Sequence, residues 1–354
     1  MKITVEYIIK HEAELWKSIR WSDKTPTCSC GSTDLYHCKD GRYKCKHCKK
    51  MFSDTSETIM KHSSLQKWQW LYVIFTLSTT RSISVRELAK HIGVSVTTSY
   101  KMLRKVRYYM GLDKISLTNI AIIDEAHLGA WANMSFRKKF KYMKEHGFMN
   151  PKDNAYTKHQ IFAASSDKKE HIVCLVNEYN QCVIKHIRVQ VNRRVIKTII
   201  KDYKVSHVIS DESRLYTNLP NCSVEQCNHS KGVWLTPNGN TTNPCENRFS
   251  WVKRIYECYH THTSPNDLQL YLNQVAFKIN HTGWTTEDIF TKLGKLCCSR
   301  HISQQGISEY LRETEIVNER QDIDPHLLEE LLNNPMIRSI EHKHKIYKWV
   351  HRVK

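Results

Sequence analysis

The chain has 354 residues, which is long enough for two or three domains with separate hydrophobic cores. Its 54 Lys and Arg residues exceed its 35 Asp and Glu residues and leave a formal net charge of +19. Because clustered cations release counterions when they bind nucleic acid, this excess favours a nucleic-acid partner. No apolar run approaches the roughly 18–20 residues of a membrane-spanning helix, so we expect no membrane partner.

The N-terminal stretch and the cysteine content predict where the protein is found. MKITVEYIIKHEAELWKSIRW has no continuous apolar segment that ends at a small-residue cleavage site, so we expect no secretory signal. Thirteen cysteines in such a chain favour reduced thiols and metal ligands over disulfides. We therefore expect a soluble protein, cytoplasmic and nucleoid-associated in a prokaryote or nuclear in a eukaryote.

Changes in composition along the chain predict four parts. Residues 1–60 hold an N-terminal segment and a cysteine-rich module, and residues 61–115 are strongly helical in pattern. Residues 116–295 begin with short β-branched runs between polar turns and end with helical patterns. Residues 296–354 are predicted to form a helical C-terminal extension, acidic in its middle and basic at its end.

The cysteine-rich module reads CSCGSTDLYHCKDGRYKCKHC and is predicted to be a zinc ribbon. Two cysteine pairs flank a hairpin with a Lys-Asp-Gly turn, and four thiolates around zinc stabilise a module too small for a core. The expected ligands of this structural Zn²⁺ are Cys28, Cys30, Cys45 and Cys48. The first pair is Cys-x-Cys where Cys-x-x-Cys is usual, so His37, Cys38 and His47 remain alternative ligands.

The stretch SVRELAKHIGVSVTTSYKMLRKVR, residues 84–107, matches a helix-turn-helix pattern. Gly93 permits the turn and Ser95 suits the cap of a second helix, in which Val96, Tyr100 and Leu103 are expected to face inward. Hydroxyls near the start of that helix suit base edges, and the cations that follow suit phosphates. The predicted DNA-binding residues of this helix are Thr97, Thr98, Lys101, Arg104 and Lys105.

The third part of the chain shows acidic residues where two buried strands are expected to end. The apolar run at 120–123 leads to Asp124, and the run VSHVIS leads to Asp211. Between them lie the strand-like runs HQIFAAS, HIVCLVN and CVIKHIRVQV and a helical pattern, NRRVIKTIIKDYK. This order is that of a ribonuclease-H-like mixed sheet, in which the first and fourth strands are neighbours. Asp124 and Asp211 should therefore lie close together and need a cation such as Mg²⁺ between them.

A third acid, Glu246, begins the basic amphipathic helix predicted from the stretch NPCENRFSWVKR. Asn243 suits the helix cap and Pro244 suits the first turn. Taken alone, Glu246 is explained by the helix dipole, but a later carboxylate also completes a site with the two aspartates. Lys253 and Arg254, further along the helix, are candidates for contacts with the phosphate backbone.

The motifs together resemble the DDE transposases of the ISXO-like insertion-sequence group, which is related to the Merlin elements. The resemblance covers roughly residues 25–283 and rests on the words DEAHLGA, DESRLY, NHS and TNPCENRFSWVKRIYECYHTHTSPNDLQLYLNQVAFKIN in their order and spacing. The chain departs from the family in its first cysteine pair and in Gly129-Ala130, where the family has Gly-Gly. The stretch at 135–159 matches only loosely.

The resemblance implies a fold, a reaction, cofactors and partners. The fold is a zinc ribbon and a helix-turn-helix module before a ribonuclease-H-like α/β catalytic domain. The metal-binding residues would be Asp124, Asp211 and Glu246, with Asn243 and His229 as further catalytic residues. Two Mg²⁺ or Mn²⁺ ions would serve the cleavage and transfer of DNA strands. The partners would be the terminal inverted repeats of an element, the target DNA and further copies of the chain, in a homodimer or a higher homo-oligomer.

Two other functions fit parts of the sequence. A DNA-binding regulator that descends from a transposase would keep the ribbon and the helix-turn-helix while its catalysis is lost. A metal-dependent nuclease for RNA–DNA hybrids would explain the fold but would leave the DNA-reading module without a task. The presence of all three acids favours the transposase.

Overall fold

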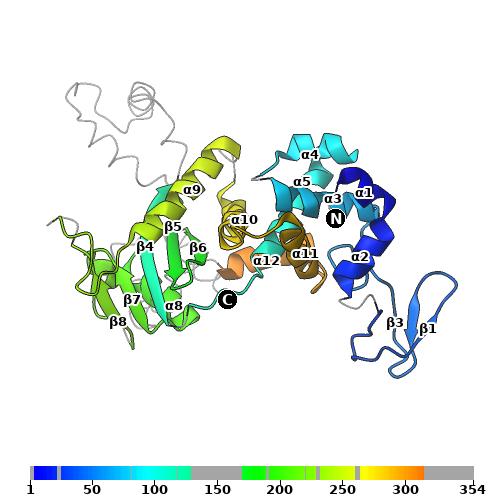
Figure 1. The fold of residues 1–354 in the computed structure, drawn as a ribbon, viewed down its shortest axis with the longest axis horizontal. Helices are drawn as coiled ribbons and strands as arrows, with labels where there is room; N and C mark the ends of the chain where they lie inside the picture. Colours follow the sequence, from blue (N-terminus) through cyan, green and yellow to red (C-terminus); the bar gives the residue numbers. More distant parts are fainter. Residues whose placement is uncertain are drawn as a thin grey trace, which may run out of the picture.

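The structure is a computed structural model in which a mixed α/β fold is built from nine described stretches of the chain. The described residues are 4–21, 25–80, 82–117, 119–128, 170–188, 191–219, 221–228, 232–259 and 264–314. Figure 1 shows the large sheet on the left, most helices of the first third of the chain on the right, and α10 and α12 between them. No helix of these stretches combines the length and the apolar composition that crossing a bilayer requires.

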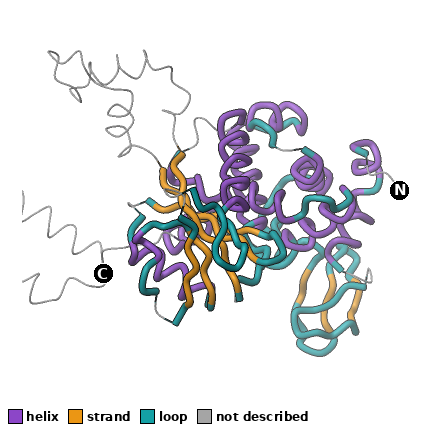
Figure 2. The backbone as a smooth tube through the Cα atoms, turned by 60° about the vertical axis from the view of Figure 1, so that its left-hand side comes forward, coloured by secondary structure: helices purple, strands orange, loops and turns teal. Residues whose placement is uncertain are grey.

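The cysteine module is a small antiparallel sheet that stands apart from the larger one in Figure 2. Its strands are β1 (Leu35–His37), β2 (Tyr43–Cys45) and β3 (Met51–Phe52). Trp21, Tyr43 and Phe52 are its large apolar side chains, and they pack around the buried Cys28 and Cys45. This core is small, which fits a module that depends on bound metal for its stability.

In the described residues of the first third of the chain, five helices lie outside this module. They are α1 (Val5–Lys10), α2 (Glu12–Arg20), α3 (Lys67–Thr79), α4 (Val85–Ile92) and α5 (Val96–Met110). The helices α11 (Thr286–Cys297) and α12 (Gln304–Thr314), from much later in the chain, share one hydrophobic core with them. The predicted boundaries at 115 and 295 divide the chain into consecutive segments. This hydrophobic core, in contrast, contains residues from before 115, from between the two boundaries and from after 295.

The helices α4 and α5 meet at the turn that the sequence predicts. Ser84 and Ser95 cap them by accepting hydrogen bonds from the backbone N–H groups of Glu87 and Thr98. Gly93 ends α4 with φ of 65°, a left-handed conformation that glycine adopts without strain. The two helices therefore begin and end for the local reasons that the sequence contains.

The inward face of α5 differs from the predicted face. Val96 and Tyr100, expected to be buried, are 51% and 38% exposed. Ser99 and Met102 are buried in their place, beside Leu103. The difference arises because α5 is covered by α10 and α12 as well as by α4, and those helices were not part of the local pattern.

The large sheet has five described strands in the order β6-β5-β4-β7-β8. They are β4 (Ile120–Leu128), β5 (Glu170–Asn177), β6 (Cys182–Ile187), β7 (His207–Ser210) and β8 (Ser223–Gln226). Neighbours β4, β7 and β8 are parallel, while β5 is antiparallel to both β4 and β6. The predicted mixed sheet is confirmed.

Helices cover both faces of this sheet. On one face, α8 (Arg193–Tyr203) packs with the short helix η3 (Arg214–Tyr216) over a core that includes Ala121 and Ile123. On the other face, α9 (Asn243–Tyr259) and α10 (Leu268–Asn280) cover Ala126, Cys174 and Ile184. The sheet is therefore the middle of three layers, and each β4 side chain belongs to one face or the other by alternation.

Two details of the sheet differ from the sequence prediction. The first strand was expected to end at Asp124, but β4 continues to Leu128 because it pairs with β5 from Ala121 to Leu128. The strand β8 was not predicted, since its four residues lack a strong apolar alternation. The predicted strand HQIFAAS, the stretch at 135–159 and residues 315–354 lie outside the described residues.

Candidate functional site

Asp124 and Asp211 lie side by side in the sheet. The neighbouring parallel strands β4 and β7 are in a register that pairs Ile122 with Ile209. Each aspartate comes two residues after its member of this pair, Asp124 within β4 and Asp211 directly after β7. Strands are about 4.8 Å apart in a sheet, so the register brings two residues that are distant in sequence to one level.

The face on which Asp124 lies is fixed by the alternation of β4. Ile122 and Ala126 belong to the core under α9, so Asp124 between them shares that face. Glu125, its neighbour, lies on the opposite face, where its carboxylate accepts a hydrogen bond from the buried Tyr216 hydroxyl. Of the two consecutive acids, therefore, Asp124 is on the side of α9 and Glu125 is on the side of α8.

The loop that carries Asp211 is held by hydrogen bonds. The Asp211 carboxylate accepts one from the backbone N–H of Ser213 at 3.0 Å. The Gln226 side chain, at the end of β8, donates to the carbonyl oxygens of Asp211 at 2.7 Å and of Ser213 at 3.1 Å. The sequence analysis missed Gln226, because its strand has too weak a pattern to be predicted.

The first turn of α9 is anchored next to Asp124. The buried Cys245 thiol donates to the carbonyl oxygens of Ile122 and Cys174, with Sγ–O distances of 3.4 and 3.6 Å. Cys174 is the partner of Asp124 in the β4–β5 register. Glu246, the next residue after Cys245, is exposed at the start of the helix. Cys245 was not singled out from the sequence, although its place before the acid was a usable signal.

The electrostatics join the three carboxylates. The pKa of Asp124 is raised from 3.8 to about 7, mainly by burial and then by the charge of Glu125. The charges of Asp211 and Glu246 raise it further, whereas a backbone hydrogen bond lowers it. Because several negative groups converge on Asp124, a bound cation would relieve a repulsion that is otherwise met by keeping a proton.

Of the other two predicted catalytic residues, Asn243 and His229, the described part of the chain contains only Asn243. Asn243 is the first residue of α9 and is exposed, rather than the cap before the helix. The cap position falls on Thr242, whose carbonyl accepts from the N–H of Glu246 at 3.4 Å, and Thr241 Oγ1 accepts from the N–H of Asn243 at 3.3 Å. The threonines before the helix thus take over the capping expected of Asn243. His229 lies outside the described residues.

The four predicted zinc ligands form a compact cluster. The Sγ atoms of Cys28, Cys30, Cys45 and Cys48 all lie within 4.8 Å of one another. In the described residues this is the one set of three or more candidate ligand atoms that meets this limit. Cys38, His37 and His47, the alternatives, do not belong to it. The backbone N–H of Cys48 is the main cause that lowers the pKa of Cys45 to about 6, which favours the thiolate, the form in which cysteine could bind zinc.

Three of the predicted DNA-binding residues lie at the open end of α5. Thr97 and Lys101 are exposed, and Thr98 is half-buried with its hydroxyl 2.9 Å from that of Ser95. Val96, also exposed, extends this end of the helix. The surface is therefore accessible to a groove of DNA.

The two cations predicted to follow them have partners within the protein. Arg104 pairs with Asp267, with a distance of 3.0 Å between Nε and Oδ1, and is 12% exposed. Lys105 donates from Nζ to the Ile59 carbonyl at 3.3 Å, and burial lowers its pKa. These contacts compete with phosphate, so Arg104 and Lys105 are poor candidates for DNA binding.

The two basic residues predicted to bind DNA on α9 are more exposed than Arg104 and Lys105. Lys253 and Arg254 are exposed on α9, the helix whose first turn contains Glu246. Trp251 and Tyr256, on the same helix, pack against the core under the sheet. Such an arrangement leaves the cations available to solvent and the aromatic rings occupied in packing.

Comparison with known proteins agrees with this geometry. Residues 123–280, which contain Asp124, Asp211 and Glu246, match the family described as the ISXO2-like transposase domain. Residues 123–280 are therefore similar to this transposase domain, and the resemblance expected from the sequence is confirmed.

A particular relative is an uncharacterized protein in transposable element ISH50 of Halobacterium salinarum. It is 27% identical over 125 residues, which are 34% of this chain and 42% of the relative. The match thus spans about two fifths of the length of the relative.

Proposed function

We propose that the protein is a DDE-type transposase that binds the ends of an insertion element and catalyses metal-dependent DNA cleavage and strand transfer. The position of Asp124 and Asp211 at one level of neighbouring parallel strands carries this proposal. The strand order β6-β5-β4-β7-β8, in which β5 alone among the described strands runs against the others, supports a ribonuclease-H-like domain. The transposase-family match over the same residues supports it further.

The donor set fits Mg²⁺ or Mn²⁺, because the site offers carboxylate oxygens, and because burial, then the charge of Glu125 and then the charges of Asp211 and Glu246 raise the pKa of Asp124. Asp124, Asp211 and Glu246 would hold two such ions. When bound, the ions supply Lewis acidity at the reacting phosphate and lower the pKa of the attacking water or 3′-hydroxyl. In the first reaction water breaks one phosphodiester; in the second the freed 3′-hydroxyl replaces an alcohol in the target strand.

The protein's own residues fix the geometry of this site. Gln226 and the N–H of Ser213 hold Asp211, and Cys245 holds the turn that presents Glu246. Lys253 and Arg254, on the exposed side of the same helix, are proposed to bind the DNA backbone next to the acids. The residues thereby orient both the ligands and the strand to be cut.

We propose that α4 and α5 form a helix-turn-helix that reads the element ends. The exposed end of α5 supports this, since Thr97, Thr98 and Lys101 sit where the recognition helix of such a motif enters the major groove. The net charge of +19 is in keeping with a DNA partner. Inverted repeats at the two ends of an element would call for at least two copies of the chain.

The test is cleavage of a DNA end by the purified protein. The DNA flanking the gene is sequenced for inverted repeats, and a labelled duplex carrying one repeat is incubated with the protein and Mg²⁺. Wild-type protein should nick the DNA at the end of the repeat, and EDTA should stop the reaction. Asp211→Asn should bind the same duplex and leave it uncut, while Asp202→Asn, on the exposed side of α8, should cut it normally.

The regulator alternative predicts a different outcome. In that case the wild-type protein would bind the repeat with sequence preference and leave it intact with Mg²⁺ and with Mn²⁺. Cleavage of RNA–DNA hybrids without preference for the repeat would instead favour the nuclease alternative.

A further inference from the structure

The helix α10 touches both the proposed DNA-reading helix and the sheet that carries the acids. Figure 1 shows it between these two parts of the molecule. Its polar side chains make the contacts in both directions, and they are mostly buried. A buried polar bridge of this kind fixes orientation more tightly than an apolar contact, because each hydrogen bond has a required direction.

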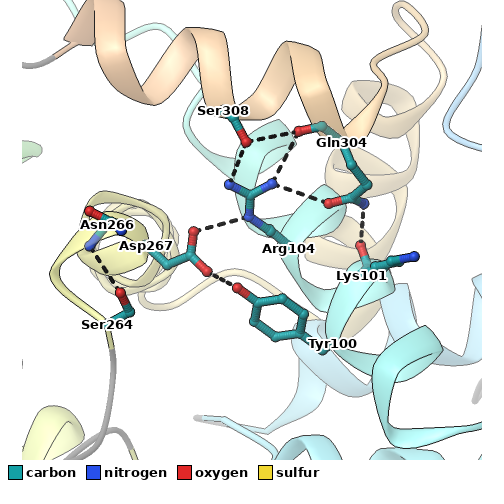
Figure 3. Close-up of polar contacts among 8 residues, drawn as sticks. All are labelled: Tyr100, Lys101, Arg104, Ser264, Asn266, Asp267, Gln304 and Ser308. Atoms are coloured by element: carbon teal, nitrogen blue, oxygen red, sulfur yellow. Dashed lines mark hydrogen bonds and ion pairs between the residues drawn. The ribbon is translucent and has the colours of Figure 1, made fainter.

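Asp267, which precedes α10, connects the helix to α5. Its carboxylate pairs with Arg104 Nε at 3.0 Å and accepts a hydrogen bond from the Tyr100 hydroxyl, as Figure 3 shows. The Asp267 side chain is 8% exposed. Although Asp267 occupies the N-cap position of α10, its side chain makes no capping hydrogen bond. The carboxylate is committed to α5.

Arg104 extends the connection to the C-terminal helix α12. Its guanidinium donates to the Gln304 carbonyl at 3.1 Å and to the Ser308 hydroxyl at 3.1 Å (Figure 3). The Gln304 amide donates in return to the Lys101 carbonyl at 3.0 Å. The middle of α5 is thus tied to α10 and α12 at the turn that follows Thr97, Thr98 and Lys101.

A second contact lies one turn further along α5. The buried Arg107 donates from Nε to the Gln274 side chain at 2.7 Å. Its guanidinium carbon lies 3.9 Å from the centre of the Tyr271 ring. Two arginines of α5 therefore hold the residue before α10 and a later turn of that helix, which opposes rotation of one helix against the other.

On its other side, α10 is joined to the edge strand β6. Gln269 accepts from the N–H of His186 at 2.8 Å and donates to the Ile184 carbonyl at 3.0 Å. Asn280, at the far end of the helix, makes the same two kinds of bond with the backbone of Cys182, at 2.7 and 2.9 Å. Both amides complete the ladder of the edge strand as a neighbouring strand would.

The attachment at Gln269 lies level with the active-site acid. Ile184 pairs with Cys174 across β6 and β5, and Cys174 pairs with Asp124 across β5 and β4. The line from Ile184, which Gln269 holds, to Asp124 therefore crosses two strand spacings, roughly 10 Å. Asp267 and Gln269 are two residues apart, so one turn of chain joins the reading helix to the level of the acids.

We propose that α10, through Asp267 and Gln269, sets the distance between the DNA sequence that α5 reads and the phosphodiester that is cut. Asp267 is then a positioning residue that acts through Arg104 and Tyr100 and does not touch the DNA. This inference rests on the proposed transposase function. The contact of Asp267 with Arg104 and Tyr100 would then determine which phosphodiester is cut, although it touches neither the catalytic carboxylates nor the DNA bases.

The experiment compares the cutting position of variants at nucleotide resolution. Asp267→Asn keeps the size of the side chain and removes its charge, and Tyr100→Phe removes one hydrogen bond and leaves the ion pair. Asp54→Asn is the control, since the Lys67–Asp54 pair, 2.6 Å apart and 25% and 16% exposed, has comparable burial and does not involve α10. Each variant is given saturating labelled repeat DNA and Mg²⁺, and its affinity and unfolding temperature are measured separately.

Wild-type and Asp54→Asn proteins should cut one phosphodiester. Asp267→Asn should bind with unchanged affinity, lose about 10–100-fold in rate at that phosphodiester, and cut neighbouring ones, since a misplacement near 1 Å has an effect of this size. Tyr100→Phe should show the same spread to a smaller degree. An Asp267→Asn protein that cuts the wild-type position at the wild-type rate would overturn the inference.

Two further outcomes are distinguishable. Equal losses of affinity and cleavage in Asp267→Asn would assign the residue to the folding of α5 and also overturn the positioning role. A wild-type protein that cuts no DNA under any condition would remove the proposed function and the inference together.

Discussion

The cysteine cluster and the carboxylate site gather their ligands in different ways. All four cysteines come from residues 28–48, with Cys28 and Cys30 in the loop before β1 and Cys45 and Cys48 at and just after the end of β2. The three acids come from β4, the end of β7 and the start of α9: the register of the sheet brings Asp124 beside Asp211, and the packing of α9 on the sheet brings the charge of Glu246 to bear on Asp124. The cysteine cluster can therefore form within one short segment of the chain, whereas the carboxylates are brought together only when the sheet and α9 have folded.

The two sites also differ in what a bound cation would do. Four thiolates around zinc would link the two ends of a module that has a small core of its own. At the carboxylate site, burial and then neighbouring negative charges raise the pKa of Asp124 to about 7, and a cation would offset both. We therefore expect metal to govern folding at the first site and charge balance at the second.

The largest expected effect is the loss of zinc from the cysteine cluster. Structural zinc contributes roughly 10–16 kcal/mol to the folding of small zinc modules. Cys45→Ser should lose the metal and unfold residues 28–52, measured as zinc content and amide hydrogen exchange. Cys38→Ser, in the same hairpin but outside the cluster, is the matched control and should keep both.

Hydrogen exchange also tests whether the two regions are independent. Chelation of zinc should remove protection from β1 and β2 and leave β4 and β7 protected. Two results would contradict the view that the cysteine cluster folds independently of the large sheet. One is loss of zinc from Cys38→Ser but not from Cys45→Ser, and the other is loss of protection in both sheets after chelation.

A smaller effect is expected from the pH dependence of the carboxylate site. A raised carboxylate pKa stabilises the folded state below the unfolded value of 3.8, and this contribution is lost as pH rises to about 7. In metal-free protein, Asp124→Asn should therefore raise the unfolding temperature at pH 8 and change it little near pH 4. Calorimetry at both pH values measures this, and added Mg²⁺ should reduce the gain at pH 8.

The control for the pH series is Asp202→Asn, a change of the same chemistry on the exposed side of α8. It should shift the unfolding temperature equally at both pH values. If Asp124→Asn raised the unfolding temperature most at low pH, the surroundings would favour the charged form of the Asp124 carboxylate instead of disfavouring it.

The smallest effect concerns the reading helix. Lys101→Ala should reduce the preference for repeat DNA over random DNA by roughly 1–3 kcal/mol if its contact is to a base. Competition binding at fixed salt measures the preference, and Lys295→Ala, an exposed lysine of α11, is the control. Equal weakening on every DNA would place Lys101 on the phosphate backbone instead.

Local patterns predicted the parts whose ligands or caps are close in sequence. The cysteine set, the caps Ser84 and Ser95 and the strand that leads to Asp211 all follow from a few neighbouring residues. The position of Asp124 beside Asp211 was also predicted. That prediction came from the order of strands and helices, which is that of a known sheet arrangement, and not from neighbouring residues.

Long-range packing explains what the sequence did not predict. Arg104 and Asp267 are 163 residues apart, so nothing in the spacing of α5 showed that its cation would be used inside the protein. Tyr100 was expected to be buried by its helical period, yet it points to the same carboxylate. The capping of α9 moved from Asn243 to the threonines before it, a shift of one residue that a sequence pattern does not fix.

The most direct test of the account exchanges the two polar residues at the start of α9. Glu246→Gln and Asn243→Ala are purified and given labelled repeat DNA with Mg²⁺, with DNA affinity and unfolding temperature as controls. We predict that Glu246→Gln binds DNA, folds normally and cuts no strand, because a neutral amide supplies none of the negative charge that the cations require. Asn243→Ala should retain measurable cleavage. An active Glu246→Gln beside a folded, DNA-binding and inactive Asn243→Ala would contradict the three-carboxylate site.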